Sequence, residues 1–340
     1  MPLRNHRTPE IVIQIDPQRN RRRLFTISIA LSVAGVQHQI RLGPVHYFHR
    51  NPVQRHALRL APASVTLFNC KKAELVFTDD AALVDWRRAR GLKTVLVSLL
   101  GAAPPGKSRF PQPLFLPIFF HPLILTPSDY AKAARLAKNV NRPIHFLFAG
   151  NCDAESYSRK QPSAISNRHE LLLAANKLKP MSIVFPKSHE ELDVLLSSVQ
   201  SEERLVWIDT NVLKVEQSRW LDLLSKTRYF LCAPGVAYPY CHNLNEAMAC
   251  GAVPVLQFSE FYVPRLEHNK TCIAFSHPNE LQDLTANLAK TEEGVWRSQS
   301  ARVAQYHQDY LSLDVFYNRL KQFMDNREEF VMDWQFAGQN

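Results

Sequence analysis

Apolar residues along this chain fall into short runs, and segments with helical periodicity separate these runs. In the first part of the chain, the runs that predict β-strands are residues 11–15, 38–42, 65–68, 75–77 and 94–98. A helix is predicted over residues 25–34, with Gly35 as its stop. Residues 101–127 are rich in proline and glycine, which predicts a loop with extended pieces.

The same pattern starts again after residues 141–143. Strands are predicted at residues 144–149, 182–185, 205–208, 229–232, 253–257 and 272–275. Helical patterns, for example at residues 168–178 and 190–199, lie between them. Strands that follow one another at intervals of about 20 to 40 residues are typical of parallel βαβ units.

We therefore expect an α/β protein with two tandem doubly wound, Rossmann-like domains that face a central crevice. The N-terminal domain is expected over residues 1–135 and the C-terminal domain over residues 136–310. Residues 311–340 predict a helical tail that can pack back on the N-terminal domain, with Trp334 and Phe336 as apolar anchors. Ligands of such folds bind at the carboxyl ends of the strands, which here surround the crevice.

The composition narrows the class of partner. Hydrophobic residues make up 46% of the chain and charged residues 21%, as in globular proteins. The formal net charge of +10 favours anionic partners, such as nucleotides, phosphorylated substrates, nucleic acid or an acidic membrane surface. The basic runs at residues 19–23 and 87–90 also fit ordinary solvated faces.

Several kinds of site are absent from the sequence. The six cysteines form no C-x-x-C pair, which favours buried free thiols in a reducing compartment. The histidines form no metal-binding spacing, and we expect neither a metal site nor a bound cofactor. No phosphate-binding, dinucleotide-binding or nucleophile-elbow motif is present, which argues against kinase, dehydrogenase and hydrolase activities. The N-terminus has no apolar signal core, so we expect a cytoplasmic protein.

The most informative stretch is HNLNEAMACGAVPVLQF at residues 242–258, which predicts a short helix followed by a strand. Asn243 is a natural N-cap for this helix, and Gly251 stands where it would close. Glu246 then has two interpretations that do not exclude each other. Its carboxylate can complete a capping box with the Asn243 amide, or it can accept hydrogen bonds from sugar hydroxyls while the helix amides hold phosphate.

The run NEAMACGAVPV, preceded by YFLCAPG at residues 229–235, resembles the donor-binding signature of GT-B glycosyltransferases, most closely of exostosin-like members. That signature is a strand, P-x-G or P-G, a short loop and E-A-x-x-x-G-x-x-P-V. The resemblance also takes in YVP at residues 262–264 and FAGN at residues 148–151, and it covers much of the C-terminal half. The first half matches no family by its motifs.

The resemblance implies that Glu246 contacts the ribose or sugar of a nucleotide-sugar donor. It further implies that Gly235 allows a close approach of the loop and that Asn243 and Asn245 contact sugar or phosphate. We assign four more positions of the motif to the donor site: Gly150, Asn151, Tyr238 and His242. Tyr238 stands where many retaining members carry a second glutamate, and His242 is the nearest substitute for an arginine that many exostosin-like proteins have; this favours inversion of stereochemistry.

A transferase of this kind also needs positive charge for its leaving group and a general base for the acceptor hydroxyl. Arg159 and Lys187, which follow predicted strands, are the preferred cations, although solvated surface charges fit them equally well. The candidate bases are Asp16, Asp79 and His121. Asp16 and Asp79 also fit turn and capping roles, and His121 fits a satisfied loop histidine.

The leading hypothesis is a metal-independent glycosyltransferase that moves a sugar from a nucleotide-sugar to a saccharide or glycolipid acceptor in surface-glycan synthesis. The glycan would be of the lipopolysaccharide, O-antigen or capsule type, and the basic N-terminal half would contact the anionic inner face of the plasma membrane. The alternative is a two-domain protein that binds a nucleotide or anionic glycan without turnover. Nucleic-acid binding rests on charge alone, because no known motif accompanies it, and it is not expected.

Overall fold

The computed structural model describes most of the chain. The described residues are 11–14, 17–41, 52–60, 63–64, 73–78, 81–97, 112–116, 120–158, 165–177, 182–197, 204–235, 239, 241–262, 264–326 and 330–334. They form two compact units, the first of residues 1–127 with 312–340 and the second of residues 128–311. Helix α5 (Pro127–Leu136), which contains the boundary expected at residue 135, belongs to the second unit from Ser128 onward.

The first unit is built on a seven-stranded parallel sheet, sheet A, in the order β3-β2-β1-β4-β5-β13-β6. Its strands are β1 (Ile11–Gln14), β2 (His38–Arg41), β3 (Ala63–Ser64), β4 (Leu75–Thr78), β5 (Lys93–Val97), β6 (Gln112–Leu116) and β13 (Phe330–Trp334). The helices of this unit are α1 (Pro17–Val33), α3 (Pro52–Leu60), α4 (Ala81–Arg88), the 3₁₀ turn η2 (Pro122–Ile124) and α13 (Leu313–Asn326). The chain winds outward from β1 in one direction and from β4 in the other, so the unit is doubly wound.

The second unit is built on a six-stranded parallel sheet, sheet B, in the order β12-β11-β10-β7-β9-β8. Its strands are β7 (Ile144–Gly150), β8 (Ser182–Val184), β9 (Arg204–Asp209), β10 (Thr227–Leu231), β11 (Val253–Leu256) and β12 (Ile273–Ala274). Its helices are α5, α6 (Ala154–Tyr157), α7 (Arg168–Ala175), α8 (His189–Ser197), α9 (Gln217–Ser225), α10 (His242–Ala249), α11 (Leu281–Ala289) and α12 (Glu293–Tyr306). Short 3₁₀ turns, η3 (Ser259–Phe261) and η4 (Pro278–Glu280), and a π-helical turn, η5 (His307–Leu311), complete it.

The predicted alternation of strands and helices is confirmed. β7, all of whose residues are buried, corresponds to the predicted strand at 144–149, and β1, β2, β4, β5 and the other strands of sheet B lie at or within a few residues of the predicted positions. The predicted strand at residues 65–68 lies outside the described residues.

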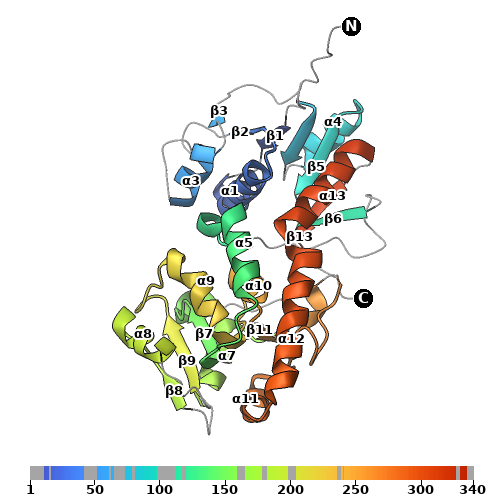
Figure 1. The fold of residues 1–340 in the computed structure, drawn as a ribbon. Helices are drawn as coiled ribbons and strands as arrows, with labels where there is room; N and C mark the ends of the chain where they lie inside the picture. Colours follow the sequence, from blue (N-terminus) through green and yellow to red (C-terminus); the bar gives the residue numbers. More distant parts are fainter. Residues whose placement is uncertain are drawn as a thin grey trace. The chain divides into compact units, whose positions relative to one another are not determined.

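The tail at residues 311–340, predicted as helical, contains the helix α13 and then a strand. Residues 330–334 form β13, which pairs in parallel with β5 and β6 and so inserts between them in sheet A (Figure 1). The C-terminal strand, from the red end of the colour bar, thus pairs with the cyan strands β5 and β6 of the first unit. Phe330, Val331 and Trp334 are residue types that favour strands, but the neighbours that pair with this segment come from residues 93–116, far away in the sequence.

Both sheets carry the apolar cores of their units. Ile13 and Phe77 in sheet A and Phe146, Leu147 and Phe230 in sheet B are at most 1% exposed. Burial of a side chain of this size stabilises a fold by roughly 1.5 to 3 kcal/mol. None of the helices in the described ranges combines the length and apolar character that a membrane crossing requires.

Candidate functional site

The carboxyl ends of β7 and β10 form the topological switch point of sheet B. The two strands are neighbours, and the chain continues from β7 toward β9 and β8 on one side and from β10 toward β11 and β12 on the other. Crossovers that leave in opposite directions open a crevice between the two strand ends, where ligands of α/β proteins bind. The predicted positions Gly150, Asn151 and Gly235 lie in the residues that end β7 and follow β10.

The loop after β7 is held by side-chain hydrogen bonds. The Asn151 side-chain oxygen accepts from the Asp153 N–H at 2.7 Å and from the Asn211 amide at 2.7 Å. The Asp209 carboxylate, at the end of β9, accepts from the N–H groups of Cys152 and Asn211 at 3.4 and 3.0 Å. Asn151 therefore organises the edge of the sheet, and its side-chain oxygen already has protein partners.

Helix α10 begins at this edge, two residues earlier than predicted. Cys241 is its N-cap residue and makes no side-chain cap, while Asn243 lies inside the helix. The predicted capping box that starts at Asn243 is therefore wrong. The Asn243 amide instead donates to the carbonyl oxygen of Ala149 on β7 at 3.0 Å, so that it ties the helix start to the neighbouring strand end. Tertiary contact with β7, which local sequence does not encode, replaces the local cap.

The far end of α10 follows the prediction. Gly251 has a φ of +75°, and its N–H bonds to Met248 O at 2.9 Å, as expected for a helix that closes on a left-handed glycine. The small residues Ala247 and Ala249 are buried, and β11 follows at once. α10 is therefore fixed at both ends.

Glu246 is fully buried in the second turn of α10. Its Oε2 accepts a hydrogen bond from the indole Nε1 of Trp220 on α9 at 2.5 Å. The Trp220 ring in turn lies edge-on against Phe230, with centroids 6.4 Å apart. Trp220 thus fixes the orientation of the carboxylate. Sequence reasoning missed it, because nothing in the spacing of residues 220 and 246 signals a contact.

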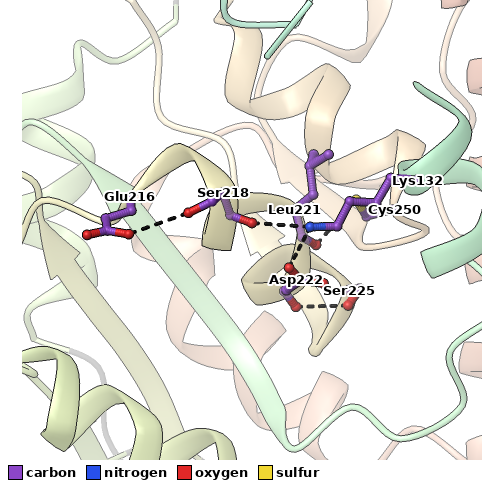
Figure 2. A network of polar contacts seen from close by, with 7 residues as sticks. All are labelled: Lys132, Glu216, Ser218, Leu221, Asp222, Ser225 and Cys250. Carbon is purple, nitrogen blue, oxygen red and sulfur yellow. Dashed lines mark hydrogen bonds and ion pairs between the residues drawn. The ribbon is translucent and has the colours of Figure 1, made fainter. Parts of the chain in front are cut away.

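Polar contacts shown in Figure 2 hold α9 and thereby Trp220 in place. Lys132 on α5 donates to the Asp222 carboxylate at 2.6 Å and to Ser218 O at 3.1 Å. The Cys250 thiol at the end of α10 lies 3.6 Å from Leu221 O. Three helices of the second unit therefore support the Trp220–Glu246 pair.

Asn245 is the most unusual residue of α10. It is 1% exposed, and neither its amide nitrogen nor its amide oxygen has a hydrogen-bond partner among the described residues. An unpaired buried polar group costs about 1 to 3 kcal/mol, so such groups deserve a functional explanation. His242, the first residue of α10, and Asn245 place two polar side chains in this helix beside Glu246.

A cavity of about 450 Å³ opens between α7 and the carboxyl ends of β8 and β9. Its walls are mainly apolar and aromatic, with Trp207, Phe185 and Leu172 among the lining residues. The Trp207 ring lies 5.8 Å from that of Phe185. Lys187, one of the predicted cations, and Asp209 also line it. A few polar groups in an apolar concavity are typical of small-molecule sites.

The predicted bases belong to the first unit. β1 ends at Gln14 and β4 at Thr78, and these two residues are paired in register at the switch point of sheet A. Asp16 and Asp79 come next in the sequence but lie outside the described residues. His121 precedes the turn η2, where its Nδ1 accepts from the Leu123 N–H at 3.3 Å, so it has a capping role.

Two predicted donor-site residues, Arg159 and Tyr238, lie outside the described residues. Lys187 is exposed, and its backbone N–H donates to the Glu191 carboxylate at 2.8 Å. Within the described part of the chain, no group of three or more His, Cys, Asp or Glu side chains is placed to hold a metal ion.

Comparison with solved structures shows the fold. A glycosyltransferase from Rickettsia africae is 12% identical, with 95% of this chain and 99% of that chain covered and a TM-score of 0.52. Anabaena Alr3699/HepE in complex with UDP-glucose is also 12% identical, with 93% and 99% covered and a TM-score of 0.51. The same protein in complex with UDP and glucose is 11% identical, with 94% and 100% covered and a TM-score of 0.50.

No protein-family model matches the chain, and no curated protein matches it. The two parallel-sheet Rossmann-like units together with these structural likenesses establish the GT-B glycosyltransferase fold for the chain.

Proposed function

We propose that this protein is a glycosyltransferase whose nucleotide-sugar donor binds at the carboxyl edge of sheet B. The observation that carries the proposal is Glu246, a buried carboxylate oriented by Trp220 within the helix that starts at the switch point. Carboxylate oxygens accept hydrogen bonds from the two hydroxyls of a ribose or sugar diol. The N-terminal amides and dipole of α10 favour the phosphate groups of the same ligand.

The cavity beside α7 supports a nucleotide as the donor carrier. Trp207 and Phe185 offer flat apolar surfaces to a heterocyclic base, and Lys187 offers a cation to a phosphate. The structural likenesses point the same way, since HepE was crystallised with UDP and with UDP-glucose. The Asn245 amide, which lacks a protein partner among the described residues, is suited to a ligand group that enters this region.

The chemistry follows from these roles. The acceptor oxygen attacks the anomeric carbon of the donor sugar, the bond from that carbon to the phosphate oxygen breaks, and a base removes the proton of the acceptor hydroxyl. We assign the base to Asp16, with Asp79 as the alternative, and we infer inversion of configuration. Lys187, Arg159 and α10 stabilise the leaving phosphate, and we expect no metal requirement, so that chelation by EDTA leaves the rate unchanged.

The acceptor and cellular place belong to the same proposal. We infer a saccharide or glycolipid acceptor in surface-glycan synthesis, an exostosin-like donor domain and a cytoplasmic protein that contacts the inner face of the plasma membrane. The net charge of +10 supports contact with anionic lipid.

A thermal-shift screen tests the donor assignment. The panel contains UDP-glucose, UDP-N-acetylglucosamine, GDP-mannose, TDP-glucose and CMP-sialic acid, together with the free nucleotides. A ligand that binds only the folded state stabilises it by about 2.7 kcal/mol at one hundred times its dissociation constant, so at least one member should raise the unfolding temperature. No shift with any member would contradict the proposal.

A turnover assay separates transfer from binding alone. Release of the free nucleotide from the best panel member, with an oligosaccharide or glycolipid acceptor, is expected to depend on Asp16 and to fall at least about hundredfold in Asp16→Asn. Tight binding without any nucleotide release would instead support a non-catalytic nucleotide-binding protein.

A further inference from the structure

Arg168, the first residue of α7, connects the two loops at the switch point of sheet B. Its Nε donates to the carbonyl oxygen of Pro234 at 2.7 Å, and its Nη2 donates to that of Ala233 at 3.4 Å. Its Nη1 donates to the carbonyl oxygen of Asn151 at 3.2 Å. One guanidinium therefore links the backbone that follows β7 to the backbone that follows β10.

The guanidinium is itself held firmly. Arg168 is 6% exposed, and its guanidinium carbon lies 4.0 Å from the ring centre of Tyr157. A capping box fixes the start of α7, because Glu170 N donates to the Asn167 side chain at 2.9 Å and Asn167 N donates to the Glu170 carboxylate at 3.1 Å. The position of Arg168 is thus set by contacts that do not involve the two loops.

Two of the three hydrogen bonds, those to Asn151 O and Pro234 O, also set the direction of backbone N–H groups in the loops. In a planar trans peptide the N–H points opposite to the C=O of the same unit. The Asn151 carbonyl faces Arg168, and the N–H of Cys152 accordingly faces away and reaches Asp209. The Pro234 carbonyl also faces Arg168, so the N–H of Gly235 is turned to the opposite side.

An arginine side chain suits this position. Its planar fork supplies donors from three nitrogens in fixed directions, whereas the three donors of a lysine ammonium all sit on one nitrogen. Among the described residues no salt bridge joins Arg168 to a carboxylate, and its guanidinium contacts three carbonyl oxygens and the Tyr157 ring. The positive charge of Arg168 favours an anionic ligand near these loops.

We propose that Arg168 is a positioning residue for the donor: it holds the loops at residues 151–153 and 233–235 in the geometry that the nucleotide-sugar requires. This inference rests on the proposed function. Arg168 acts through the backbone of the loops, and a misplacement of such loops by about 1 Å can cost up to hundredfold in rate.

Hydrogen exchange tests the positioning without any ligand. In Arg168→Lys, the amides of Cys152 and Gly235 should exchange about tenfold faster or more than in the wild-type protein, because the carbonyl anchors are lost. Amides in the centre of β7 and β10 should keep their protection. Unchanged exchange at both loop amides would overturn the proposal.

Kinetics with the best member of the nucleotide-sugar panel test the consequence for the donor. In Arg168→Lys and Arg168→Ala, the KM for the donor should rise about tenfold or more while the KM for the acceptor stays the same. A merely structural role would lower kcat through loss of folded enzyme and leave both KM values unchanged, which would overturn the proposal. Partial restoration of the donor KM in Arg168→Ala by millimolar methylguanidinium would support it.

Arg142 provides the matched control. It is equally buried in the same unit and also donates to backbone carbonyls, but it lies at the opposite ends of β7 and β10. Arg142→Lys should lower the unfolding temperature and leave the donor KM unchanged. A donor KM that rises equally in both lysine variants would overturn the proposal. If the proposed function itself is wrong, the wild-type protein will already show no rise in unfolding temperature with any nucleotide-sugar of the panel.

Discussion

The two ends of the β7–β10 pair are both closed by a buried arginine, yet they differ in what surrounds it. At the amino ends, Arg142 donates to Thr227 O and Cys250 O, each at 2.8 Å. At the carboxyl ends, Arg168 donates to Asn151 O and Pro234 O. The two residues have the same chemistry and the same kind of acceptor.

The amino edge is filled by protein. Arg142 is 2% exposed, with the Trp296 ring centre 5.5 Å from its guanidinium carbon, and burial lowers its pKa to about 10. At the carboxyl edge lie the start of α10, the cavity beside α7 and the Asn245 amide, which has no hydrogen-bond partner in the described part of the chain. Parallel strands place helix N-termini at one edge only, and that edge is where an anionic ligand is favoured. The two arginines are of the same residue type, so their position in the sheet separates them. Arg142 stabilises the fold, and Arg168 is the residue that we propose to position the donor loops.

The largest expected effect lies at the amino edge, in Gly251→Ala. The φ of +75° disfavours a side chain, and a Cβ would lie 2.8 Å from Arg142 Nη2 and 2.9 Å from Ser300 Oγ. We expect a loss of about 3 kcal/mol in the free energy of unfolding, measured by urea denaturation. Donor affinity should be unchanged.

Gly294→Ala is the control for this substitution. Gly294 lies in the first turn of α12, and a Cβ there would meet no atom within 4 Å. Replacement should stabilise the protein by roughly 0.5 kcal/mol through the lower entropy of the unfolded chain. Equal destabilisation by both glycine substitutions would show that the close contacts at Gly251 are not the cause of its effect.

The second prediction concerns pH and His145, the second residue of β7. Burial first, and then the charge of Arg228, lower its pKa to about 4. The unfolded chain therefore binds a proton at higher pH than the folded chain, so stability is full above the ordinary histidine pKa of about 6.5 and is lost as pH falls toward 4. His145 should contribute a loss of about 2 kcal/mol between pH 7 and pH 5, and His145→Gln should remove this contribution from the total loss. If the free energy of unfolding of His145→Gln depended on pH as it does in the wild-type protein, His145 would not be a source of the loss.

At the carboxyl edge, Glu246→Gln should weaken donor binding by about ten- to thirtyfold, or about 1.5 to 2 kcal/mol, because a charged acceptor of sugar hydroxyls becomes neutral. Isothermal titration calorimetry measures the change. Glu216→Gln, an exposed glutamate at the start of α9, is the control and should bind normally. Full donor affinity in Glu246→Gln would remove Glu246 from the site.

The smallest effect is expected for Trp220→Phe. It removes the N–H that bonds Glu246 and keeps an aromatic ring against Phe230, so donor affinity should fall about fivefold, or about 1 kcal/mol. Trp296→Phe removes an indole N–H that has no partner among the described residues at the amino edge. Trp296→Phe should leave donor affinity unchanged. An equal loss of donor affinity in Trp220→Phe and Trp296→Phe would contradict the difference between the two edges.

Local patterns predicted much of this molecule. The apolar run before Gly150 became β7, and Gly251 closes α10 as expected, because a buried strand and a left-handed glycine are properties of a few consecutive residues. The N-cap predicted at Asn243 was wrong, because the Asn243 amide donates to the carbonyl oxygen of Ala149, which is remote in sequence. β13 was missed for the same reason, since its partners lie in residues 93–116.

The sequence by itself determined the two α/β units and the helix that carries Glu246, because periodicity and turn residues act over short distances. It placed Arg142 just before a predicted strand and Arg168 at the start of a predicted helix, without showing what either side chain contacts. Only the tertiary structure decided that one is enclosed at the amino edge and the other joins the loops at the switch point. The order of the strands in the sheet determines which edge each arginine occupies. Strand order is in turn fixed by contacts between residues far apart in the chain.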